Sequence, residues 1–205
     1  MNNIKEYITE KLKINKDIKV KEYNYHPKDK DELESLINKL IKERGKNADL
    51  NDIDVSNITD MSKLFINLNP HNIDISEWDV SNVKYMGYMF YYCKNFNSDL
   101  SRWDVSNVKD MSNMFYYCIN FNSDLSSWDV SNVKDMGFMF YNCENFNSDL
   151  NKWDVSNVKD MRLMFYDCEK FNSDLSKWDV SNVTNMESMF NRCNSLKNKP
   201  SWYNE

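Results

Sequence analysis

A strict 25-residue repeat constrains this 205-residue chain more than any other feature. The hexapeptide Trp-Asp-Val-Ser-Asn-Val recurs with that period and begins at Trp78, Trp103, Trp128, Trp153 and Trp178. A frame set at the preceding Asp-Leu-Ser gives six copies, 49–73, 74–98, 99–123, 124–148, 149–173 and 174–198. A fixed period between about 20 and 50 residues is typical of a solenoid, in which each unit buries its apolar face against its neighbours.

The apolar spacing within one copy predicts its local structure. Met111, Met114 and Cys118 lie at i, i+3 and i+7, which is one face of about two helical turns. Valines flank the turn-forming pair Ser106 and Asn107, which indicates short extended segments joined by side-chain-closed turns. The predicted fold is therefore an α/β repeat, a solenoid of six coils with short strands and one short helix each.

The chain outside the repeats predicts two caps. Residues 29–45 place apolar side chains on one helical face, with acidic residues at the start and Gly45 as the stop. We expect this helix to cover the open end of the first coil, and the tail around Trp202 to seal the last one. The predicted organisation is 1–48 as an N-terminal helical segment, 49–198 as the solenoid and 199–205 as the tail. The apolar face of the capping helix comprises Leu33, Leu36, Ile37, Leu40 and Ile41.

A further amphipathic helix is predicted from Asn2 to about Lys13. It is too short to be stable alone, so it either packs on the capping helix, frays, or binds a partner groove. Its sequence Ile-Lys-Glu-Tyr-Ile-Thr-Glu resembles the leader of internal capsid proteins in large tailed phages. In those proteins a maturation protease cuts after a Glu two residues beyond an aliphatic residue, and Ile8-Thr9-Glu10 fits that pattern.

The repeat itself resembles a known family. The string Phe-Asn-Ser-Asp-Leu-Ser-x-Trp-Asp-Val-Ser-Asn-Val-Lys-Asp-Met-x-x-Met-Phe-x-x-Cys is similar to the repeat of BspA-like leucine-rich-repeat surface proteins, in a branch of unknown function. The resemblance covers residues 49–198 and implies a right-handed leucine-rich-repeat-like solenoid with a binding or adhesion role. It implies no catalytic residues. The first copy departs from the pattern, with Ile53 for Trp and Leu68 for Cys.

Charge and hydropathy narrow the expected partners. Residues 1–48 carry 12 Lys/Arg and 9 Asp/Glu, whereas residues 49–205 carry 14 and 23. An acidic body repels phosphate backbones, so we expect no nucleic-acid partner. No apolar run reaches membrane-spanning length and none forms a secretory signal, so we expect no membrane span and a cytoplasmic or virion-associated protein. The family resemblance alone favours the cell surface.

Five cysteines follow the repeat, and their odd number argues against a complete set of intramolecular disulfides. They share the expected helical face with the methionines, so we interpret them as small buried thiols. Bound metal is one alternative, although zinc ligands must converge on one point and a ladder does not. Disulfides between neighbouring coils are the other alternative. The cysteines are Cys93, Cys118, Cys143, Cys168 and Cys193.

Aspartates form two ladders on the same period. We expect each carboxylate to accept backbone N–H groups in its own turn, with a calcium site as the alternative. The first ladder is Asp54, Asp79, Asp104, Asp129, Asp154 and Asp179, and the second is Asp99, Asp124, Asp149 and Asp174.

Asparagines form a third ladder, which we expect to satisfy backbone groups inside the coil corner. These are Asn82, Asn107, Asn132, Asn157 and Asn182. The only histidines are His26 and His71, and no nucleophile triad, metalloprotease motif or phosphate loop occurs. We therefore expect neither an enzyme nor a cofactor or metal.

The surface that varies between copies is the candidate binding site. The residues after the first methionine of each copy change most, and a tyrosine row runs beside them. Tyrosine offers a large contact area at low rotamer cost, so the row suits a protein or glycan partner; alternatively it only stacks on itself between coils. The candidate surface is Tyr88, Tyr91, Tyr92, Tyr116, Tyr117, Phe138, Tyr141, Leu163 and Tyr166.

Two functions follow as hypotheses. The first is a monomeric, non-enzymatic module that recognises a protein or glycan through this surface. The second is a structural or decoration component, of a phage or another particle, docked by its N-terminal helix.

Overall fold

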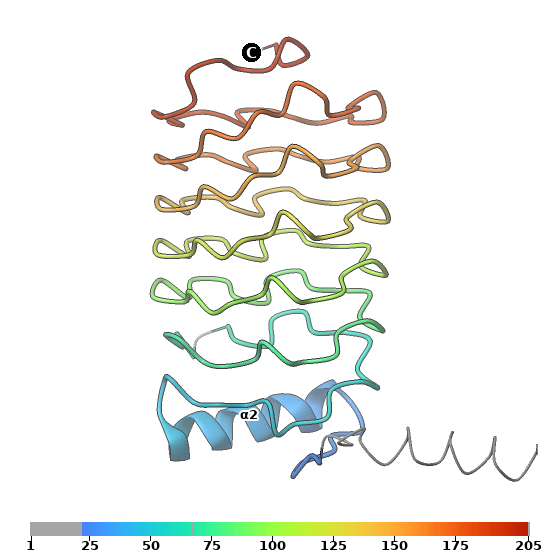
Figure 1. Ribbon diagram of the computed structural model, residues 1–205, viewed down its shortest axis with the longest axis vertical. Coiled ribbons are helices and arrows are strands. Elements are labelled where there is room, and N and C mark those ends of the chain that lie inside the picture. The colour runs from blue at the N-terminus through green and yellow to red at the C-terminus, as the bar shows by residue number, and fades with distance from the viewer. Residues whose placement is uncertain (1–21, 67, 205) are drawn as a thin grey trace, which may run out of the picture.

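The six repeats lie one above another as successive layers of a single stack (Figure 1). A computed structural model describes residues 22–66 and 68–204. Helix α2, Lys30–Arg44, lies against the first layer at one end of the stack, and the C-terminal tail lies at the other (Figure 1). The helix expected over residues 2–13 falls outside the described residues.

The predicted α/β solenoid of strands and helices is wrong. In the described part of the chain α2 is the one α-helix, and the only strand-like pairs are isolated parallel bridges between residues about 25 apart. Each layer is built from turns instead. The bridges are Tyr25–Ile53, Asp49–Asp74, Asp60–Tyr85, Tyr85–Asp110, Asp110–Asp135, Asp135–Asp160 and Asp160–Asn185.

Left-handed residues explain why the expected helix in each layer does not form. Asn113 and Tyr117 have φ of 57° and 62°, which ends a right-handed helix at once. The segment 111–118 around them forms tight turns, in which the N–H of Met114 donates to the carbonyl of Met111 at 3.2 Å. The same two positions are left-handed in the other layers, at Lys63, Tyr88, Phe138, Leu163 and Ser188, and at Tyr92, Asn142, Asp167 and Arg192.

The remaining N–H groups of this segment bond to the next layer, which replaces the helical hydrogen bonds. The N–H of Met111 donates to the carbonyl of Asp135 at 3.0 Å, and that of Tyr117 to the carbonyl of Tyr141 at 2.8 Å. A left-handed non-glycine residue costs about 1–2 kcal/mol. The ladder of bonds between layers offsets this cost, so the turns are stable only when layers are stacked.

Aromatic columns run through the core and connect the layers. Trp128 is 3% exposed, stacks on Trp153 at 6.5 Å between ring centroids, and donates from Nε1 to the carbonyl of Leu100 at 3.0 Å. The same Nε1 bond to the preceding layer recurs at Trp78, Trp103, Trp153 and Trp178. A second column of buried phenylalanines stacks at 5.1–5.8 Å and comprises Phe65, Phe90, Phe115, Phe140, Phe165 and Phe190.

Helix α2 covers the N-terminal end of this core, as predicted. Asp29 caps the helix by accepting the N–H of Glu32, and Gly45 ends it with φ 87° and ψ 179°, a conformation open essentially to glycine alone. The apolar face is buried in the same core as Leu50 and Ile53 of the first layer. Its buried residues are Leu33, Ile37, Leu40 and Ile41, with Leu36 partly buried.

The C-terminal tail places a tryptophan where a seventh layer would have one, as the sequence predicts. Trp202 stacks on Trp178 at 6.3 Å and donates from Nε1 to the carbonyl of Leu175 at 2.9 Å. Tyr203 meets Phe190 edge to face at 5.0 Å between ring centroids. The tail thus closes the tryptophan side of the last layer.

Candidate functional site

The aspartates close turns, as the sequence analysis expected. Asp104 Oδ1 accepts the N–H of Ser106 at 3.0 Å, and Asp99 Oδ1 accepts that of Ser101 at 2.9 Å. The hydrogen bonds from Ser106 lower the pKa of Asp104. Since a side-chain oxygen closes these turns, the chain needs only three glycines. The same bond forms at Asp54, Asp79, Asp129, Asp154, Asp179, Asp124, Asp149 and Asp174.

The asparagine ladder lies on the surface, so the prediction of an internal ladder is wrong. Asn132 is exposed, and its Nδ2 donates to the carbonyl of Ser106 in the preceding layer at 2.7 Å. The expected role does hold, because each amide satisfies a backbone carbonyl at a turn. The equivalent bonds are made by Asn82, Asn107, Asn157 and Asn182.

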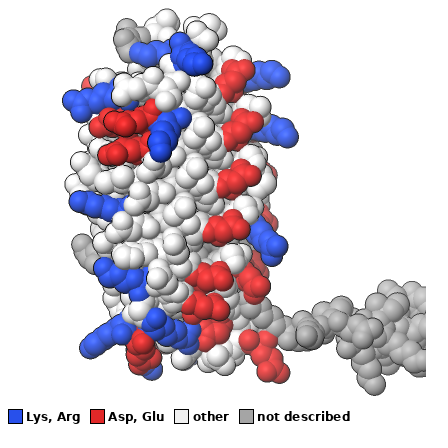
Figure 2. Space-filling view, turned by 60° about the vertical axis from the view of Figure 1, so that its left-hand side comes forward, with Lys and Arg blue, Asp and Glu red and all other residues white. Residues whose placement is uncertain are grey.

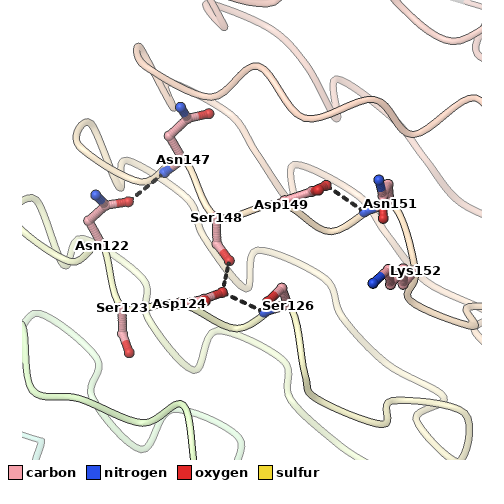
Figure 3. A pocket seen from close by; sticks show the side chains of 9 residues that line it. All are labelled: Asn122, Ser123, Asp124, Ser126, Asn147, Ser148, Asp149, Asn151 and Lys152. Carbon is pink, nitrogen blue, oxygen red and sulfur yellow. Dashed lines mark hydrogen bonds between the residues drawn. The ribbon is translucent and has the colours of Figure 1, made fainter.

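A polar hollow of about 400 Å³ opens between the third, fourth and fifth layers (Figure 3). Ser148 donates to Asp124 at 3.3 Å, and Asn122 accepts the N–H of Asn147 at 2.8 Å. Asp149 accepts the N–H of Asn151 in the same way. Because these side chains bond chiefly to one another and to the backbone, we assign the hollow a structural role. In residues 22–66 and 68–204 no three His, Cys, Asp or Glu side chains gather to hold a metal ion.

The five cysteines are buried and unpaired. The thiol of Cys143 donates to the carbonyl of Phe115 in the preceding layer at 3.0 Å, and the other four make the equivalent bond. Burial raises the pKa of Cys93 and of Cys193 to about 12 and raises that of the three central thiols well above 9. Neither a disulfide nor a metal cluster involves them in the described part of the chain.

This burial predicts slow thiol chemistry. A disulfide reagent at pH 8 reacts with thiolates, so the native protein should show almost no reaction over an hour and five thiols after denaturation. Cys193 is the most exposed at 9% and should react first. Rapid release of two or more equivalents from native protein would contradict the buried ladder.

The tyrosine row forms one continuous stack across four layers. Ring centroids lie 4.7 Å apart for Tyr91 and Tyr116, 4.6 Å for Tyr116 and Tyr141, and 4.8 Å for Tyr141 and Tyr166. Tyr92 and Tyr117 form a parallel pair beside it at 4.8 Å. The row therefore stacks on itself, as one interpretation of the sequence held, and the four rings are also partly exposed.

The most exposed aromatic side chains lie in the second layer. Tyr92 is 45% exposed and Tyr88 is 36% exposed. Tyr85 is 46% exposed and was missed by the sequence analysis, although its replacement of the aspartate found at Asp110 was a visible departure from the repeat. The aromatic face is defined here as Tyr85, Tyr88, Tyr91, Tyr92, Tyr116, Tyr117, Phe138, Tyr141 and Tyr166; Leu163 lies beside it, partly buried.

Cations border the aromatic face. Lys94 Nζ lies 5.8 Å from the ring centroid of Tyr117, and the guanidinium of Arg162 lies 5.4 Å from that of Phe138. At the far end Arg192 lies 5.5 Å from the ring centroid of Tyr166. Burial raises the pKa of Tyr116 to about 12, so its hydroxyl stays protonated at neutral pH. The face thus offers hydroxyl groups and cations around apolar ring edges.

A row of aspartates one turn before the tyrosines is in a less favourable electrostatic environment than the turn-closing aspartates. Asp135 is bridged to Asp110 and Asp160 in the neighbouring layers, and Arg162 pairs with Asp160 at 3.3 Å. Burial, together with the two neighbouring carboxylates, raises the pKa of Asp135. Acidic side chains also recur along the whole length of the stack on the face shown in Figure 2, with Lys and Arg beside some of them.

Asp135→Asn is expected to stabilise the protein by about 0.5 kcal/mol, because like charges facing each other across layers repel. The amide still accepts the Gly137 N–H, which Asp135 binds at 2.9 Å, and Asn185 occupies the same position naturally. Because its pKa is raised in the folded protein, the charged Asp135 destabilises the fold. This destabilisation is full at neutral pH and vanishes below about pH 3.8. Thermal melts should show a gain of about 1–2 °C at pH 7 that disappears near pH 3.5. Asp104→Asn, at a site whose pKa is lowered, should show no gain.

Comparison with known proteins identifies a family of unknown function. The model of a family described as Mycoplasma protein of unknown function, DUF285, matches residues 33–136 and 100–203. No curated protein and no solved structure matches the chain. The matched segments overlap within the repeats, which agrees with the tandem-repeat character of the chain. Among the described residues no helix has the length and apolar character needed to cross a membrane.

Proposed function

We propose that this chain, which belongs to the DUF285 family, is a non-enzymatic binding module. It recognises another protein through the aromatic face. The observation that carries the proposal is the accessible, pre-stacked set of tyrosines on successive layers. Tyrosine is enriched in protein interfaces because it contributes area, an apolar ring and a hydroxyl at low entropic cost. The resemblance of the repeat to BspA-like surface proteins adds adhesion as a setting for this contact.

The stacking geometry favours a protein over a glycan. Tyr91, Tyr116, Tyr141 and Tyr166 stack nearly parallel, with interplanar angles of 18°, 6° and 4° between successive rings. Their faces are thus largely occupied by one another, which leaves mainly ring edges and hydroxyls to meet a partner. A sugar packs on an open ring face, whereas peptide groups and side chains contact ring edges and hydroxyls. The bordering cations Lys94 and Arg162 suit acidic side chains of such a partner.

Replacing Tyr91, Tyr116 and Tyr141 together by serine is expected to reduce retention of the partner protein by at least tenfold, since buried aromatic anchors dominate interface energies. Retention is measured by quantitative mass spectrometry after capture from an extract of the native host. The matched control replaces Arg102, Lys152 and Lys177 by serine, at an exposed position where the chain already has Ser127.

The control should retain the partner, and circular dichroism should show both variants folded. A folded tyrosine variant that retains the same proteins as the wild type contradicts the proposal. Retention that survives protease treatment of the extract also contradicts it, because it identifies a glycan rather than a protein.

A further inference from the structure

Tyrosine rings of the second and third layers lie against one another across the boundary between the layers. Tyr92 stacks on Tyr117 with ring centroids 4.8 Å apart and an angle of 1° between the rings. Tyr92 also lies diagonally across from Tyr116, at 5.8 Å between centroids and 36° between the rings. At these separations neighbouring aromatic rings are in contact, so a small tilt of one ring brings carbon atoms of two phenols together.

Tyr92 is also open to solvent, whereas the other readily oxidised side chains nearby are not. Its side chain is 45% exposed, and Tyr116 and Tyr117 are partly buried. The cysteines are at most 9% exposed, and the tryptophans of the repeats are at most 4% exposed. The four methionines of these two layers are fully buried. Since exposure governs which side chain an oxidant reaches, tyrosine is the group that an oxidant meets first on these layers.

We propose that this cluster is a site of oxidative cross-linking, at which a haem peroxidase that uses hydrogen peroxide joins Tyr92 to Tyr116 or Tyr117 as a dityrosine. Each phenol loses one electron and one proton and becomes a phenoxyl radical. The two radicals form a carbon–carbon bond between their ortho positions, and the hydrogen on each of those carbons moves to the phenol oxygen. The two electrons and two protons that are released reduce hydrogen peroxide to two molecules of water.

The fold favours coupling within one molecule. Because the two rings are held side by side, their effective concentration far exceeds that of rings on separate molecules. Tyr85 is 46% exposed, but no other tyrosine ring stacks on it within residues 22–66 and 68–204, so we expect no cross-link there. The product joins two layers covalently, which stabilises a fold by restricting the unfolded chain. The cross-link does not depend on the protein-binding role proposed for the aromatic face.

The test treats the full-length protein, at low concentration, with a plant haem peroxidase and hydrogen peroxide. Dityrosine fluorescence should appear, and the intact protein should lose two hydrogen atoms while it remains a monomer on a denaturing gel. Tryptic digestion separates Tyr92, in peptide 85–94, from Tyr116 and Tyr117, in peptide 110–134. Mass spectrometry of the digest should therefore find these two peptides joined, with the bond at Tyr92.

Tyr92→Phe keeps the stacked ring but removes the phenol, so the yield of the joined peptides should fall by about tenfold. Tyr85→Phe is the matched control, because it removes a tyrosine of the same layer with nearly the same exposure, and it should keep the wild-type yield. Equal yields from the two variants, a dityrosine confined to peptide 85–94, or products found only as cross-linked dimers overturn the proposal. Oxidation of methionine or tryptophan without dityrosine also overturns it.

Discussion

Trp128→Ala is expected to lower the free energy of unfolding by about 3–5 kcal/mol, the usual cost of deleting a buried tryptophan. Trp128 is 3% exposed, stacks on Trp153 and lies beside Phe115. Its loss opens a cavity between layers and removes the hydrogen bond that Nε1 donates to the carbonyl of Leu100. Because the turns depend on stacked neighbours, the damage should spread to both adjacent layers. Chemical denaturation followed by far-ultraviolet circular dichroism measures the change.

Trp202→Ala supplies the matched control for this experiment. Trp202 makes the same kind of Nε1 bond and stacks on Trp178, but it is only partly buried. Its replacement should therefore cost less than half as much. Equal costs at the two positions would show that the tryptophan column does not hold the layers together.

Ile37→Asp in helix α2 is expected to cost about 4 kcal/mol or more. Ile37 is fully buried against the first layer, so the variant loses the apolar contact and buries an unpaired carboxylate. The helix should detach and expose the apolar end of the stack, including Leu50 and Ile53. Loss of stability should be accompanied by binding of a hydrophobic dye and by aggregation, since a stack needs a polar cap to stay soluble.

Ser35→Asp tests whether the charge alone causes this effect. Ser35 is exposed on the same helix, two residues away. An aspartate there meets water rather than the core, so melting should change by less than about 2 °C. Similar losses in the two variants would mean that the helix, and not its buried face, is sensitive to charge, and would contradict the capping role of α2.

The repeat, its frame and the two ends of the stack could be predicted from the sequence. The period of the tryptophans defines the layers, and the apolar face over Leu33 to Ile41 is a true helical face. Asp and Ser side chains identify the turns because a carboxylate two residues before an N–H closes one locally. These features rest on local chemistry that the sequence shows directly.

The sequence could not distinguish the helix expected within each repeat from the tight turns that the structure has there. The i, i+3, i+7 spacing of Met111, Met114 and Cys118 also suits successive tight turns, because both place every third or fourth residue inward. What separates them is the left-handed backbone at positions such as Tyr117 and Phe138. The aromatic residues at these positions give no sequence signal for that conformation, whereas Asn113 and Asn142 at equivalent positions are of the type that favours it. It is held by hydrogen bonds to the neighbouring layer.

The candidate site was predicted in part. The position of the tyrosine row follows from the period alone. The large exposed fractions of the Tyr85 and Tyr88 side chains depend on their place in the second layer. The surface position of the asparagine ladder depends on which side of the turn faces water. That property is not local to the asparagines themselves.

The central claim, that the aromatic face binds a protein, is tested most directly by photo-crosslinking from single positions. A benzophenone amino acid at Tyr117 or at Tyr92 reports contact with the aromatic face, and the same group at Arg102 or at Lys177 reports contact elsewhere on the surface. The proposal predicts one discrete protein adduct from positions 117 and 92 and none from positions 102 and 177. Adducts confined to positions 102 and 177, with the partner still retained, would contradict it.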